Sequence, residues 1–70
     1  MEKRENFGRY IKEKRKEAGL SQKELAKQLF VSESAVSKWE SGENGISRKY
    51  HKKLAKLYGV TVDELLSDQN

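Results

Sequence analysis

The sequence predicts an all-α fold, a compact bundle of five short helices. Short segments with apolar residues at helical spacing are separated by Ser or Thr and by Gly, which commonly start and end helices. Proline is absent, glycine occurs only five times, and no segment alternates apolar and polar residues as a strand does. Helices this short are unstable alone, so we expect packing around one core to hold all five.

The first helix is expected to run from Asn6, a candidate N-cap, to Gly19, which suits the left-handed residue at a helix C-terminus. Residues 1–5 before it and residues 67–70 at the other end of the chain are expected to be frayed. Its apolar residues recur near helical spacing: Phe7, Ile11, Ala18 and Leu20.

The second and third helices each begin at a serine. Ser21 and Glu24 have the spacing of a capping box, and Ser32 is the next candidate N-cap. Phe30 and Val31 break the pattern between the two helices, and Gly42 should end the third. The residues expected on their buried sides are Leu25, Ala26, Leu29, Val36 and Trp39.

The last two helices follow a loop at residues 43–45. Ser47 is expected to cap the fourth helix and Gly59 to end it, while Thr61 and Glu64 have the spacing of a second capping box for the fifth. The residues expected to face inward are Tyr50, Leu54, Leu57, Tyr58, Leu65 and Leu66.

Composition excludes several classes of protein. The chain has no Cys and one His, so no disulfide framework, zinc site or iron–sulfur site is expected, and no cofactor. It has no apolar run of transmembrane length, no secretory signal, no nucleophile–base pair and no phosphate-binding loop. We therefore expect a small cytoplasmic binding module, not an enzyme, with no membrane or small-molecule ligand.

Positive charge is unevenly distributed along the chain. The formal net charge is +4, and residues 45–60 contain five Lys or Arg and no acid. Residues 1–20 contain seven Lys or Arg and four acids. Such segments favour a polyanionic partner, although runs of charge also occur as ordinary solvated helix faces.

The segment at about 22–41 has the geometry of a helix-turn-helix. Two helices of about eight residues are joined by so few residues that they must cross at a large angle. Small Ala26 permits the crossing, and Val31 fills the turn. With Val36 and Trp39 turned inward, a polar patch is left on the opposite face, and a helix with such a face can enter a major groove. The patch consists of Glu33, Ser34, Ser37 and Lys38.

The segment LSQKELAKQLFVSESAVSKWESGE, residues 20–43, resembles the helix-turn-helix of the Cro/C1-type (XRE family) transcriptional regulators. The resemblance extends to IKEKRKEAGLSQKELA before it and LAKLYGVTVDELL after it, and covers roughly residues 7–66. It implies a lambda-repressor-like fold, with one DNA-binding domain over 1–70 and a core at about 6–66. It also implies a regulator that binds double-stranded DNA as a homodimer, through a recognition helix at about 33–41. The two copies pair either in solution or only on the DNA.

The resemblance also assigns roles to individual positions. Gln22 matches a position that touches a phosphate and braces the recognition helix, and Ser41 matches a frequent phosphate contact. Glu33, Ser34 and Lys38 match positions that commonly read base edges, with Ser37 beside them. Arg15 and Glu40 match an ion pair between the first and third helices. Leu57, Val60 and the last helix match a segment that often forms the dimer contact.

The chemistry of these side chains agrees with most of the assignments. Lys38 can donate to guanine or to phosphate, whereas Glu33 either accepts from a cytosine amine or stabilises the helix N-terminus. Ser34 and Ser37 are short and imply close approach. The strongest candidates for phosphate contacts are Arg48 and Lys49, just after the loop. Lys23 and Lys27 on the second helix come next. Lys52, Lys53 and Lys56 can equally be an exposed helix face.

Phe30 departs from the family pattern, which usually has glycine at this turn position because the backbone often has positive φ. Either the turn conformation differs here, or Phe30 is held by packing, with its side chain available as an exposed contact surface. The function expected is sequence-specific regulation at a palindromic operator, with repression favoured and activation the alternative. The alternative is a protein–protein module of the same fold, such as an antitoxin or adaptor with secondary DNA binding. The acids near the recognition helix and Phe30 are its support.

Overall fold

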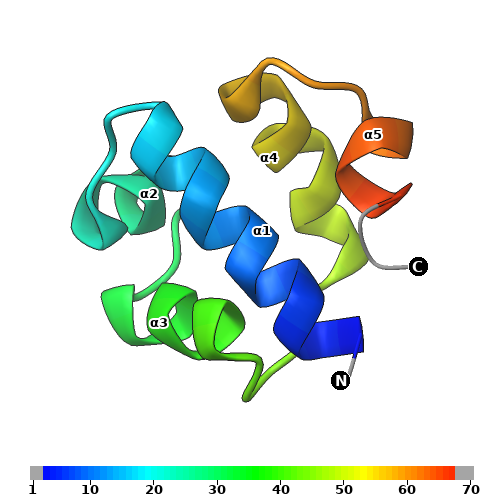
Figure 1. Cartoon of the computed structure of the whole chain (residues 1–70). Coiled ribbons are helices and arrows are strands. Elements are labelled where there is room, and N and C mark those ends of the chain that lie inside the picture. Colours follow the sequence, from blue (N-terminus) through cyan, green and yellow to red (C-terminus); the bar gives the residue numbers. More distant parts are fainter. Residues whose placement is uncertain (1–2, 68–70) are drawn as a thin grey trace.

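A computed structural model describes residues 3–67, with side chains for residues 6–66, and over these residues it is entirely helical and loop (Figure 1). This confirms the expected all-α fold of five helices. A short 3-10 turn, η1, precedes the fourth. The elements are α1 (Lys3–Glu17), α2 (Gln22–Leu29), α3 (Glu33–Ser41), η1 (Arg48–Tyr50), α4 (His51–Tyr58) and α5 (Val62–Ser67).

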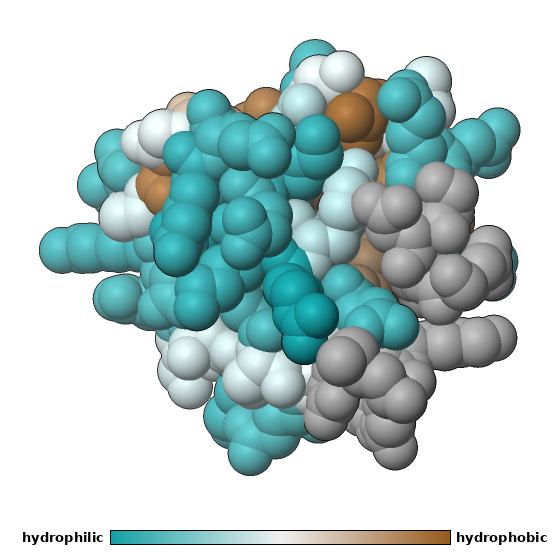
Figure 2. Space-filling model, in the orientation of Figure 1, coloured by the Kyte–Doolittle hydropathy of each residue, from teal (hydrophilic) through white to brown (hydrophobic). Residues whose placement is uncertain are grey.

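The helix α1 crosses the middle of the molecule, with α2 and α3 on one side of it and α4 and α5 on the other (Figure 1). All five helices contribute to one core, and burying these side chains is what holds such short helices in place. The face shown in Figure 2 is largely hydrophilic, with small separate hydrophobic patches. The core residues are Phe7, Ile11, Leu25, Ala26, Leu29, Val36, Trp39, Leu54, Ala55 and Leu65.

The N-terminal helix starts earlier than expected. α1 begins at Lys3, so Asn6 lies inside the helix and is not its N-cap. The expectation of fraying was wrong for residues 3–5 and for Ser67, which are helical, and residues 1–2 and 68–70 lie outside the described part. Lys, Arg and Glu are good helix formers, which accounts for the extra turn. The C-terminal end of α1 was predicted correctly, since Gly19 has φ +73°. Ala18, one of the apolar residues at helical spacing, is exposed.

Gly8 lets α1 pack directly against the end of α3. A Cβ atom at this position would lie 2.4 Å from the carbonyl oxygen of Trp39 and 2.7 Å from that of Glu40. Both atoms are backbone, so neither can swing aside as a long side chain would. The close approach of the two helices therefore requires glycine.

The serine and threonine caps mostly form as expected. Ser32 Oγ accepts from the backbone N–H of Ala35, and Thr61 and Glu64 form a reciprocal capping box. Ser47 is the exception: it precedes η1 and its side chain makes no capping bond. Its backbone carbonyl instead accepts from the N–H of Tyr50, which closes the 3-10 turn.

The capping box of α2 gives a pH-dependent contribution to stability. Ser21 N–H donates to Glu24 Oε1 at 2.8 Å, and Ser21 Oγ accepts from Glu24 N–H at 3.0 Å. Hydrogen bonding to the carboxylate, first from the Ser21 backbone N–H and then from the Ser21 side chain, lowers the pKa of the Glu24 carboxyl below its ordinary value of 4.5. Because the folded state favours the carboxylate, this stabilisation is present above that value and is lost as the pH falls through the lowered one.

We therefore expect Glu24→Gln to be less stable than the parent protein at pH 7, with a difference that disappears in acid. Thermal unfolding of both proteins between pH 7 and about pH 2 checks this. A difference that stays constant over the whole range would contradict it.

Candidate nucleic-acid interface

The turn between α2 and α3 has the sharp geometry expected of a helix-turn-helix. Phe30 adopts the left-handed conformation, with φ 58° and ψ 43°. Its N–H donates to the carbonyls of Ala26 and Lys27, and Val31 N–H donates to Ala26 as well. The positive φ shows that the turn has the conformation usual for glycine, so the expectation of a different turn is wrong. Phe30 is 90% exposed, so packing does not hold its side chain. A non-glycine residue in this conformation costs about 1–2 kcal/mol.

The polar face of α3 is exposed along the whole helix. Val36 and Trp39 are buried, as predicted. On the opposite face the structure places the side chains of Glu33, Ser34, Ser37 and Lys38, all exposed. Glu33 lies in the first turn of α3, where the helix dipole stabilises a carboxylate even without a ligand.

A buried ion pair fixes α3 to the rest of the domain. Arg15 Nε donates to Glu40 Oε2 at 2.6 Å and Arg15 Nη2 to Glu40 Oε1 at 3.2 Å, and both residues are 8% exposed. Arg15 Nη1 also donates to the carbonyl of Leu20 at 2.8 Å. Hydrogen bonding to Glu40 raises the pKa of the Arg15 guanidinium, so the guanidinium stays charged despite its burial.

Gln22 joins this pair to the start of α2. Its Nε2 donates to Glu40 Oε1 at 2.9 Å, so the first residue of α2 braces α3 through a side-chain hydrogen bond. The structure thus brings together Arg15, Gln22 and Glu40, three of the residues singled out from the sequence. The remaining N–H of the amide is the group with which Gln22 would donate to a phosphate.

The other candidates for phosphate contacts differ in exposure and in the hydrogen bonds that their side chains already make. Lys23 and Lys27 are exposed on α2. Ser41 is exposed, but its hydroxyl donates to the Lys38 carbonyl at 3.1 Å and must rotate to reach a phosphate. Arg48 and Lys49 are exposed on η1, across the loop from α3. Lys49 Nζ lies 5.2 Å from the centre of the Tyr50 ring.

Burial of Glu40 changes the charge that α3 presents. The sequence contains three acids and one lysine in residues 32–44, which suggested a weakly positive recognition surface. Glu40 faces inward and its charge is balanced by Arg15. Only Glu33 and Glu43 are therefore exposed beside Lys38, and the outer face is less acidic than the sequence count indicates.

The segment expected to form a dimer contact is partly exposed. Leu57 and Val60 are half-buried, and so are Val62 and Leu66 on α5. Together with three basic or titratable residues of η1 and α4, Val62 and Leu66 line a surface hollow of about 510 Å³. Those residues are Arg48, His51 and Lys52.

Within the described residues, no group of three His, Cys, Asp or Glu could hold a metal ion. None of the helices in that part of the chain is both long and apolar enough to span a membrane.

The comparisons with known proteins match most of the sequence of this chain. A family model described as helix-turn-helix matches residues 11–65. The chain is 41% identical over 63 residues to the HTH-type transcriptional activator BcrR of Enterococcus faecalis, covering 90% of this chain and 31% of that protein. It is 36% identical over 62 residues to the cryptic phage CTXphi transcriptional repressor RstR of Vibrio cholerae, covering 89% of this chain and 56% of that protein. The chain thus spans about a third of one relative and just over half of the other.

Proposed function

We propose that this chain, which belongs to the helix-turn-helix family, is a transcriptional regulator that binds double-stranded DNA in a sequence-specific manner. One observation supports this most strongly: α3 presents an exposed polar face while its inner face is fixed by a buried ion pair. A helix held rigidly by one face can place the side chains of the other against base edges without a large loss of entropy on binding. We further propose that residues 1–70 act as one DNA-binding domain, with its core at about 6–66.

In the proposed complex, α3 enters the major groove and its outer face reads the bases. Lys38 donates to guanine O6 and N7, Ser34 and Ser37 approach the base edges closely, and Glu33 accepts from a cytosine amine. Lys38 lies at most two helical turns from the first turn of α3. The contacts between the outer face of α3 and the bases therefore fall within a few base pairs.

Flanking cations supply most of the affinity in this proposal. Lys23 and Lys27 from α2 and Arg48 and Lys49 from η1 contact the phosphates, with Gln22 and Ser41 beside them. Each phosphate contact releases counterions, so the logarithm of the affinity should fall with the logarithm of salt concentration by about 0.9 per contact.

We also propose that two copies bind a palindromic operator, with half-sites about one helical turn apart. The half-buried apolar residues Leu57, Val60, Val62 and Leu66 are the surface available for the contact between the copies. The two relatives are named as an activator and a repressor. Occupying an operator blocks polymerase by exclusion alone, whereas activation requires a further contact, so repression is the action we propose.

The experiment that tests this function is selection from sheared genomic DNA at about 150 mM salt, followed by sequencing of the retained fragments. We expect a palindrome to be enriched, and a reporter placed behind it to be expressed less when the protein is present. Retention without any enriched sequence would contradict sequence-specific binding, and higher expression of the reporter would contradict repression.

A further inference from the structure

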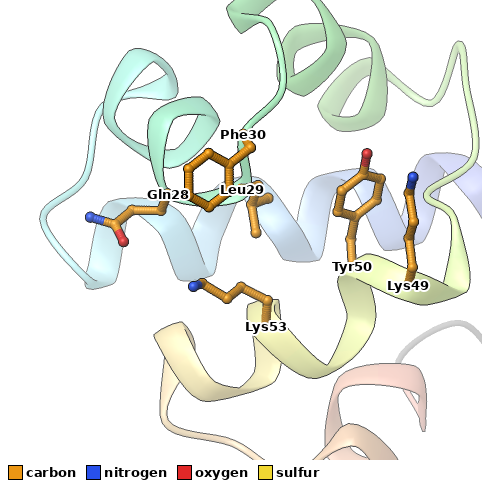
Figure 3. A pocket seen from close by; sticks show the side chains of 6 residues that line it. All are labelled: Gln28, Leu29, Phe30, Lys49, Tyr50 and Lys53. Carbon is orange, nitrogen blue, oxygen red and sulfur yellow. The ribbon is translucent and has the colours of Figure 1, made fainter.

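A groove lies between the end of α2 and the η1–α4 segment (Figure 3). Of the residues that line it, the proposed DNA complex uses Lys49 alone, as a phosphate contact. Its volume is about 350 Å³. None of the four outer residues of α3 lines it. We call it the Phe30 groove, and its lining residues are Gln28, Leu29, Phe30, Lys49, Tyr50 and Lys53.

Phe30 forms one wall of this groove and does not pack in the hydrophobic core. Its neighbour Leu29 is buried, whereas Phe30 is 90% exposed. Among the residues that the structure describes, Phe30 is the large hydrophobic residue that is exposed. Its backbone has φ 58°, a conformation that glycine adopts without strain. The fold therefore gains nothing from an aromatic side chain here, but a partner could pack against it.

The opposite wall carries positive charge. Lys49 and Lys53 line the groove, and its lining contains no carboxylate. Neither lysine forms an ion pair with any described residue. Tyr50 lies between them with its ring 5.2 Å from that of Trp39, which connects the floor of the groove to the core (Figure 3).

We propose that the Phe30 groove docks an acidic peptide segment of a partner protein. An apolar side chain of the segment packs against the Phe30 ring, and flanking carboxylates pair with Lys49 and Lys53. Phosphates would satisfy the lysines but would leave the exposed ring without an apolar contact, so a peptide fits the whole surface better than DNA does. This interaction goes beyond the proposed DNA binding and does not depend on it.

The test begins with a random twelve-residue peptide library displayed on phage and selected on the parent protein. We expect the enriched peptides to combine a large apolar residue with Asp or Glu. A synthetic peptide of the enriched sequence is then titrated against variants, with the fluorescence of Trp39 as the signal. We expect Phe30→Gly and Lys53→Glu each to weaken binding at least tenfold, and the control Lys52→Glu, which is exposed on α4 but outside the groove, to change it less than threefold.

Phe30→Gly should fold like the parent protein because glycine adopts the left-handed conformation without strain. A loss of binding in this variant would therefore not reflect unfolding. The proposal fails if no such peptide is enriched, or if the enriched peptides bind Phe30→Gly as well as the parent. It also fails if Phe30→Gly weakens binding to operator DNA tenfold and leaves peptide binding unchanged, because the groove would then belong to the DNA interface. Failure of operator selection alone would contradict the proposed function and leave this result standing.

Discussion

Replacing Glu40 with alanine should destabilise the domain by about 3–5 kcal/mol. The change removes both of its hydrogen bonds with Arg15 and the one that it accepts from Gln22. It leaves the Arg15 guanidinium buried without its counter-charge, and that desolvated charge is the main cost. Since small domains are stable by only about 5–15 kcal/mol, denaturant unfolding should show a greatly lowered midpoint.

Two further variants separate this explanation from a general effect of losing a carboxylate. Glu43→Ala removes an exposed glutamate three residues away and should change stability by less than about 0.5 kcal/mol. The double variant Arg15→Met with Glu40→Leu removes the charge together with its partner and should recover much of the loss. Equal small effects for Glu40→Ala and Glu43→Ala would contradict the structural role of the pair.

Gly8→Ala is expected to have the second largest effect, a net loss of about 2–3 kcal/mol. Alanine stabilises a helix by about 1 kcal/mol relative to glycine. The substitution would therefore stabilise α1 if no atoms of α3 lay near the added methyl group. The added methyl group would instead meet two backbone carbonyls of α3 at 2.4 and 2.7 Å, and the helices would have to separate. For a domain of this size, this loss corresponds to a decrease in Tm of roughly 10–20 °C.

Gly19→Ala provides the matched control for Gly8→Ala. Nothing lies within 4 Å of a Cβ at Gly19, but its φ is +73°, so the substitution tests backbone strain without a steric clash. We expect a loss of about 1 kcal/mol there, smaller than at Gly8. A Gly8→Ala protein as stable as the parent would show that α1 and α3 do not approach each other as described.

The elements that follow local rules could be predicted from the sequence. The Ser21–Glu24 and Thr61–Glu64 boxes and the three glycines that end helices depend on neighbouring residues alone, and each forms as expected. The inward positions of Val36 and Trp39 followed from helical spacing. The Ser47 cap failed because a 3-10 turn, closed by a backbone bond, precedes α4.

Features that depend on distant contacts were harder to predict. Gly8 was not singled out, although glycine in the middle of a helix carries a cost that hints at a close approach. The hydrogen bond from Gln22 to Glu40 joins residues 18 positions apart. The burial of Glu40 could be inferred only from the family resemblance, and its effect on the exposed charge of α3 became apparent only in the fold.

The central claim is that the outer face of α3 reads DNA, and paired lysine variants test it most directly. Lys38→Ala and Lys56→Ala each remove one exposed cation, the first from the outer face of α3 and the second from the last turn of α4. Their affinities are measured for the selected operator and for its single-base variants. We expect Lys38→Ala to lose about 1–3 kcal/mol of binding free energy and to discriminate less at one or two base pairs. Lys56→Ala should keep the parent's base preference. Equal losses in both variants, with base preference unchanged, would contradict the claim.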